Sequence, residues 1–179
     1  GLDKFLTNPQ DFLLLHQFYC ENNSWPDNRT NLMEGACKSL LKEPNTSHSE
    51  AVDDRVNDHD LRRASDYLAS IIMLSNITGI SKDRNTATKD FPAIHEFKED
   101  LFLMKIATGR RVYKSEENSR IEPKHRKIAE FMAARYLALR VREGLPLSRV
   151  MALMMGMDGG ILPDLRSVYA WLVTMLSGM

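Results

Sequence analysis

The sequence predicts a mainly α-helical protein that contains a single β-hairpin. Over most of the 179 residues, apolar side chains recur every three or four positions, which places them on one face of a helix. A strand-like alternation with a turn between two halves occurs convincingly only near residues 110–122. Hydrophobic residues make up 43% of the chain and charged residues 27%, a composition typical of globular proteins.

The first two helices are expected to form a short antiparallel pair. Pro9 suits the first position of a helix, where its missing N–H would have no partner in any case, and Asn22 lies where the apolar pattern stops. Asp27 is a candidate N-cap for the second helix, whose apolar residues from Leu32 to Leu41 share one face. We assign this pair to residues 1–46.

The middle of the chain has the parts of a winged helix-turn-helix. Helical patterns cover residues 61–77 and 94–109, the hairpin follows at residues 110–122, and Pro123 leads into a long helix. We assign the winged-helix module to residues 47–127. Two further helical patterns follow the long helix, so residues 128–179 are interpreted as the start of a second helical domain.

The charge is balanced overall and uneven locally. Lys plus Arg and Asp plus Glu each total 24, yet Lys105 to Lys127 contains eight basic and only three acidic residues. Such cations on a wing can neutralise phosphates, so a DNA-binding winged helix is one reading, and contact with an acidic protein partner is another. The candidate patch consists of Arg110, Arg111, Lys114, Arg120, Lys124, Arg126 and Lys127.

The sequence contains no recognisable catalytic motif. The phosphate-binding pattern G-x-x-x-x-G-K-[ST] and the nucleophile elbow G-x-S-x-G are both absent. Cys20 and Cys37 form no disulfide framework, which favours a reducing compartment. His16 lies four residues before Cys20, and we interpret this pair as a half-exposed histidine beside a buried cysteine rather than a metal site. We therefore expect no catalytic residue, no metal ligand and no enzymatic activity in this chain alone.

One segment resembles a known family. Residues 125–138 read His-Arg-Lys-Ile-Ala-Glu-Phe-Met-Ala-Ala-Arg-Tyr-Leu-Ala. This is similar to the stretch H-x-[ST]-hydrophobic-x-E-F-x-A-A-x-Y-L, which follows the winged helix of NACHT-type STAND ATPases, a group that includes NOD-like receptors and many bacterial defence proteins. Lys127 departs from the usual Ser or Thr. The stretch from Leu6 to Leu15 also resembles the proline-containing motif that opens the first helical domain of such ATPases.

The resemblance implies a non-catalytic regulatory segment located after the P-loop core of a larger ATPase. It implies that Pro9 packs near the nucleotide base and that His125 contacts the β-phosphate of ADP. The fragment itself would hold no cofactor, whereas the parent would bind ATP or ADP with Mg²⁺. The expected partner is the P-loop core of the same chain, with a homo-oligomer on activation, and the expected location is the cytoplasm.

Two other functions remain open from the sequence. The first is a DNA-binding winged-helix protein that uses the basic segment 105–127, and the second is a purely structural helical interaction module. We expect no membrane association, because no apolar run approaches the ~20 residues of a membrane span. The chain begins at Gly1 without a signal-peptide pattern, and we expect it to be a piece of a longer protein.

Overall fold

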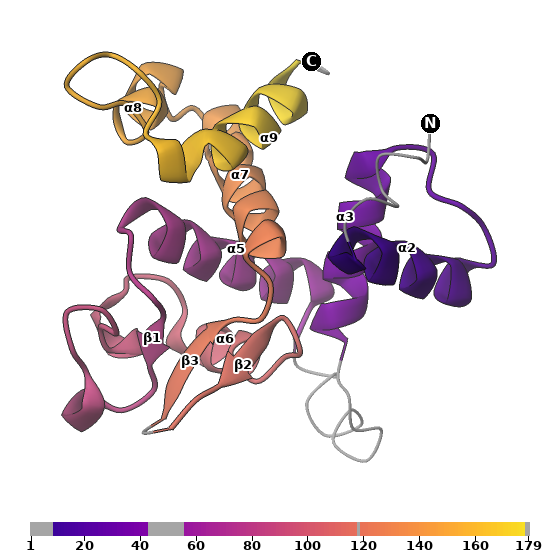
Figure 1. Ribbon diagram of the computed structural model, residues 1–179. Helices are drawn as coiled ribbons and strands as arrows, with labels where there is room; N and C mark the ends of the chain where they lie inside the picture. The colour runs from indigo at the N-terminus through magenta and orange to yellow at the C-terminus, as the bar shows by residue number, and fades with distance from the viewer. Residues whose placement is uncertain (1–8, 43–55, 118, 178–179) are drawn as a thin grey trace. The chain divides into compact units, whose positions relative to one another are not determined.

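The computed structural model describes residues 9–42, 56–117 and 119–177, and it confirms a mainly helical fold with a small antiparallel sheet (Figure 1). The chain forms two compact units, residues 1–42 and residues 43–179. Each unit is described by itself. The predicted boundary at residues 46–47 lies outside the described residues, and the second unit includes both segments that follow it.

The first unit is a helical pair made of α2 (Pro9–Asn22) and α3 (Arg29–Leu41). The backbone of α3 comes close to α2 at Gly35, where any side chain would collide with the ring of Phe18. The N-cap of α3 is Asn28, whose side chain accepts a hydrogen bond from the backbone N–H of Asn31, so the expectation that Asp27 is the cap is wrong. The buried apolar residues of the pair are Leu14, Leu15, Leu32, Met33, Ala36, Cys37, Leu40 and Leu41.

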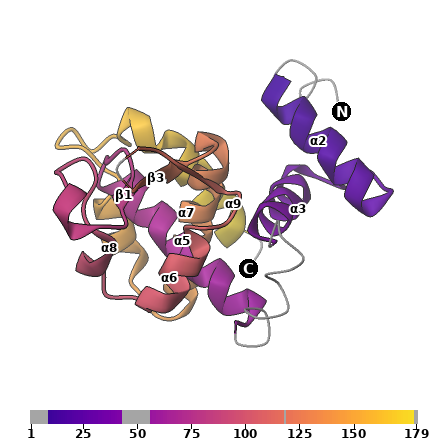
Figure 2. The ribbon, with the colours of Figure 1, turned by 90° about the horizontal axis from the view of Figure 1, so that it is seen from below.

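The second unit is organised around α5 (Asp58–Leu74) and α7 (Arg126–Arg142), which pack against each other. The small residues Ala133 and Ala134 of α7 are fully buried. The short helix α6 (Leu101–Ala107) also packs on α5. Viewed from below in Figure 2, α5, α6 and α7 form one cluster.

The sheet has three short strands in the order β1-β3-β2, all antiparallel. The predicted hairpin is present as β2 (Tyr113–Ser115) and β3 (Arg120–Pro123). The third strand, β1 (Ile80–Ser81), was not expected from the sequence. It approaches β3 closely because Gly79 has no side chain, and a Cβ there would collide with the carbonyl oxygen of Ile121.

The second unit contains a helix, further helical pieces, a hairpin and a long helix in the order that the sequence predicted. After α5 come β1, the 3-10 turns η2 (Arg84–Thr86) and η3 (Ile94–Glu96), α6, the hairpin and α7. Sequence periodicity predicted one long helix over residues 94–109, but the structure has η3 and α6 as two separate pieces. The side chain of Asp100 accepts hydrogen bonds from two backbone N–H groups and starts α6 as a new helix.

The last part of the second unit packs against the C-terminal half of α7. It contains α8 (Leu147–Ala152), the 3-10 turn η4 (Pro163–Leu165) and α9 (Arg166–Leu176). In Figure 1 this region lies above α5 and the sheet lies below it. No helix among the described residues is long and apolar enough to cross a membrane. The shared core consists of Ala133, Ala134, Leu137, Ala138, Val150, Met154, Leu165, Val168 and Leu172.

Candidate functional site at the start of helix α7

The junction between β3 and α7 fixes the position of His125. The backbone N–H of Lys124 donates to the carbonyl of Val112, which ties the junction to the hairpin at 2.9 Å. His125 then has an extended backbone, with φ −137°, and its carbonyl accepts from the first-turn N–H groups of Ile128 and Ala129. Both of those side chains are buried. His125 is therefore held at the first turn of a helix whose next residues are anchored in the core.

The motif residues after His125 divide into core and surface positions. Phe131 is fully buried, and its ring and that of Trp171 form a T-shaped pair with 5.0 Å between ring centroids. Ala133, Ala134 and Leu137 are buried as well. The packing of α7 accounts for most of the motif, whereas His125 lies half-buried at the helix end, before the buried run begins.

The electrostatics of this helix end favour an anion. The helix dipole places partial positive charge at the N-terminus, and the first turn of α7 contains no acidic residue. The side chain of His125 makes no capping hydrogen bond. Burial lowers the pKa of His125, and the neighbouring charge of Lys124 lowers it further. The imidazole is therefore mainly neutral at neutral pH, and a neutral imidazole carries one N–H.

Glu130 and Arg126 fix the next turn. The Nε of Arg126 lies 3.1 Å from Oε1 of Glu130, which is 8% exposed. The same guanidinium donates to the backbone carbonyl of Asp164 at 3.2 Å and lies 3.5 Å from its carboxylate. Arg126 thus links the start of α7 to η4, and its charge is largely compensated by two carboxylates.

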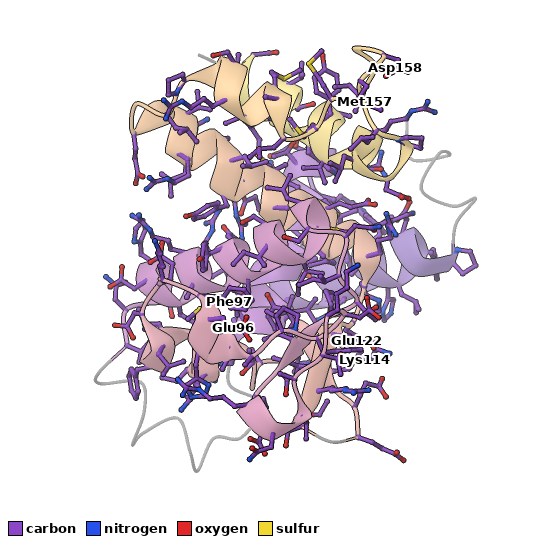
Figure 3. The ribbon with its side chains drawn as sticks, turned by 90° about the vertical axis from the view of Figure 1, so that its left-hand side faces the viewer. Glu96, Phe97, Lys114, Glu122, Met157 and Asp158 are labelled. Atoms are coloured by element: carbon purple, nitrogen blue, oxygen red, sulfur yellow. The ribbon has the colours of Figure 1, made fainter. Side chains whose placement is uncertain are left out.

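The basic patch predicted from the sequence is not a continuous row of accessible cations. Arg110 is only 2% exposed, so its assignment to a phosphate-binding surface is wrong. Lys114 lies 2.7 Å from a carboxylate oxygen of Glu116 and 3.1 Å from one of Glu122, and Figure 3 shows Lys114 beside Glu122. These two carboxylates raise the pKa of Lys114. Arg120 stacks over the ring of Phe91, with 4.8 Å between its guanidinium carbon and the ring centroid.

The remaining members of the patch differ in exposure. Arg111 and Lys124 are exposed, Lys127 is half-buried, and Arg126 is held by Glu130 and Asp164 as described above. The basic residues are close together in the sequence, but in the structure they differ in exposure and in pairing with carboxylates. The sequence did contain a signal for the pairing of Lys114. Glu116 lies two residues after it, and Glu122 lies opposite it in the predicted hairpin.

Pro9 and the His16–Cys20 pair lie in the first unit. Pro9 is the first residue of α2 and is exposed. Cys20 is exposed and not buried as expected, and its sulfur lies 3.7 Å from Nε2 of His16. No group of three or more metal-ligating side chains occurs in the described ranges.

Sequence reasoning missed the ion pair that joins the two central helices. Arg135 of α7 binds Asp66 of α5 through two hydrogen bonds of 2.6 and 2.7 Å, and their side chains are only 11% and 6% exposed. Helical periodicity gave no signal for it, because on a helical projection Asp66 lies opposite the apolar stripe of Leu61, Leu68 and Ile72.

In comparisons with known proteins, no family model, curated protein or solved structure matches this chain.

Proposed function

We propose that this chain is a non-catalytic regulatory segment of a NACHT-like STAND ATPase, in which it couples the nucleotide state to downstream signalling. The observation that carries the proposal is the position of His125. The motif that resembles the family is used for packing from Ile128 onward, and the histidine before it stands at a helix start that favours anions. In this proposal His125 donates to a phosphate of ADP held by the parent's P-loop core.

The coupling requires only a difference in binding between two states. A neutral imidazole can donate one hydrogen bond to a phosphate oxygen, and that bond exists only when the segment is closed over the nucleotide. A bound ADP then favours the closed state by the free energy of the contacts made in that state alone. The buried Asp66–Arg135 pair and the α5–α7 packing support this mechanism, because they join the two central helices of the second unit.

The parent would supply the remaining parts of the site. The proposal assigns ATP or ADP and Mg²⁺ to its P-loop core, with Pro9 near the nucleotide base. It also places the parent in the cytoplasm as a bacterial defence or regulatory protein that forms a homo-oligomer on activation.

A DNA-binding function has less support. A winged helix that reads DNA needs exposed cations on its wing and a polar recognition helix. Here Lys114 is paired with two glutamates, Arg110 is buried, and the α6 sequence Leu-Phe-Leu-Met-Lys-Ile-Ala offers Lys105 as its one cation. A purely structural module would also use this packing, and it remains the second alternative.

The deciding experiment measures ADP release from the full-length parent. The coding sequence upstream of Gly1 should first reveal a P-loop and an acidic Mg²⁺-binding strand. His125→Ala should then speed ADP dissociation by about tenfold, the equivalent of one hydrogen bond to a charged group. His59→Ala is the matched control, because His59 is an exposed histidine in the first turn of another 17-residue helix.

Two results would reject the proposal. One is an upstream region without a nucleotide-binding core. The other is ADP dissociation that is unchanged in the His125→Ala parent. Titration of this chain with duplex DNA at two salt concentrations tests the alternative, since tight binding that falls steeply with salt would favour the DNA-binding function.

A further inference from the structure

The connection between α8 and η4 exposes methionine sulfur to solvent. Met157 is fully exposed, and Met155 is 41% exposed. Met154, in the same stretch of chain, is completely buried in the core that α7, α8 and α9 share. Neighbouring methionines of one loop thus differ completely in their access to molecules in solution.

Hydrogen bonds within the loop fix the place of Met157. The backbone N–H of Gly156 donates to the carbonyl of Gly160 at 2.8 Å, and Gly159 has φ +77°, a conformation that favours glycine. The side chain of Asp158 turns back into the loop and accepts from the N–H of Gly160 at 3.0 Å. Figure 3 shows Met157 and Asp158 on this loop, near the top of the view. The loop therefore holds Met157 in a defined place with its side chain in solvent.

The other methionines of the described residues are better protected than Met157. Three of them are partly buried against the core, namely Met73, Met151 and Met175. Those buried within it are Met33, Met104, Met132 and Met154. We propose that Met157 is a reversible oxidation site, at which a peroxide forms methionine sulfoxide and makes the surface of this loop more polar. The proposal is independent of the proposed function of the chain.

The oxidation step consumes one peroxide molecule for each methionine. A lone pair on the thioether sulfur attacks one peroxide oxygen, the O–O bond breaks and an S–O bond forms. The sulfur loses two electrons, which reduce the departing oxygen, and this oxygen takes the proton of the transferred hydroxyl and leaves as water. Thiol-dependent methionine sulfoxide reductases reverse the change, since two thiols become a disulfide while the sulfoxide oxygen leaves as water.

Oxidation of Met157 changes a surface and spares the core. The loop also exposes Leu153 and Leu162, so a sulfoxide at Met157 adds a polar group to an otherwise apolar surface. Because the side chain of Met157 is not buried, its oxidation removes no packing from the fold. Oxidation of a core residue such as Met154 would place a polar group among apolar side chains.

The first test asks which methionine takes the first oxygen atom. The chain carries Cys20→Ser, which removes an exposed thiol that peroxide also attacks. It is treated with hydrogen peroxide and digested with trypsin, and fragmentation mass spectrometry locates the added oxygen. We expect Met157 to react fastest and Met155, at 41% exposure, to react about two- to threefold more slowly. Met154 should react at least about a hundredfold more slowly, because its sulfur is reached only when the core opens.

The second test measures the change of the surface. Limited oxidation should shorten retention on a hydrophobic-interaction column and leave the melting temperature unchanged, and reductases for both sulfoxide epimers should restore the retention. Met157→Leu keeps an apolar side chain without oxidisable sulfur, so its retention should not change on the same treatment. Met155→Leu is the matched control and should respond as the parent variant does.

Three results would overturn the proposal. The first is that another of the described methionines takes the first oxygen. The second is a loss of retention that persists in Met157→Leu. The third is unfolding of the chain when Met157 alone is oxidised.

Discussion

Helices α5 and α7 have the same length of 17 residues and pack against each other, yet they begin in opposite ways. The side chain of Asn57 caps α5 by accepting from the N–H of His59 at 2.9 Å, and Asp58 and Asp60 complement the helix dipole. At the start of α7, His125 makes no capping bond and Arg126 follows it. The start of α5 is capped and carries acidic residues, whereas the start of α7 has neither a side-chain cap nor an acidic residue in its first turn.

Although α5 and α7 begin differently, they share one buried ion pair, Asp66–Arg135. Asp66→Ala would leave the guanidinium of Arg135 buried without its carboxylate, and we expect a loss of about 3–5 kcal/mol in the free energy of unfolding. Urea denaturation measures this loss. The matched variant Arg63→Ala breaks a more exposed pair between α5 and Glu143, the residue that follows α7, and should cost under about 1 kcal/mol. Equal losses in the two variants would show that burial of the pair does not matter.

Removal of the Asn57 cap tests how much the start of α5 contributes to stability. Asn57→Ala deletes the acceptor for the N–H of His59, and we expect the free energy of unfolding to fall by about 1 kcal/mol. Asn57→Asp keeps an acceptor at the same position and should retain stability. Thermal unfolding of the two variants side by side gives the difference. Identical melting temperatures for Ala and Asp would contradict the role of the cap.

The converse experiment gives α7 a capped start like that of α5. His125→Asp places an acceptor and a negative charge on a backbone that already has the extended geometry of an N-cap. We expect a gain of about 0.5 kcal/mol over His125→Ala in urea denaturation. In the parent ATPase the same substitution should release ADP faster, because the carboxylate repels phosphate. If the chain becomes more stable but ADP retention is unchanged, the proposed contact between His125 and phosphate is contradicted.

The pH dependence of stability gives the smallest effect. Burial and Lys124 hold the pKa of His125 below its ordinary value of 6.5, so the unfolded chain binds a proton more readily than the folded chain. The contribution of His125 to stability is complete above pH 6.5 and is lost as the pH falls from there through the folded pKa. His125→Gln should show a shallower fall over this window in denaturation at successive pH values. Parallel curves for the two proteins would contradict the lowered pKa.

Local patterns explain why so much of the fold could be predicted. Helix α7 and the hairpin depend on neighbouring residues, so periodicity and a polar turn were enough to place them. Strand β1 has only two residues and pairs with β3, which lies some forty residues later, so no local signal indicated it. The expected burial of Cys20 was wrong because apolar residues from Phe12 to Leu15 cover more than one face of α2, and periodicity could not decide which face packs.

The sequence by itself determined the fold class, the hairpin and the position of His125 at the start of a helix. These follow from the spacing of apolar residues and from the backbone limits of proline and glycine, which act over a few residues. Only the tertiary structure decided which charges are available. It buried Arg110, paired Lys114 with two glutamates and matched Asp66 with Arg135, because burial and ion pairing depend on residues brought together from distant parts of the chain.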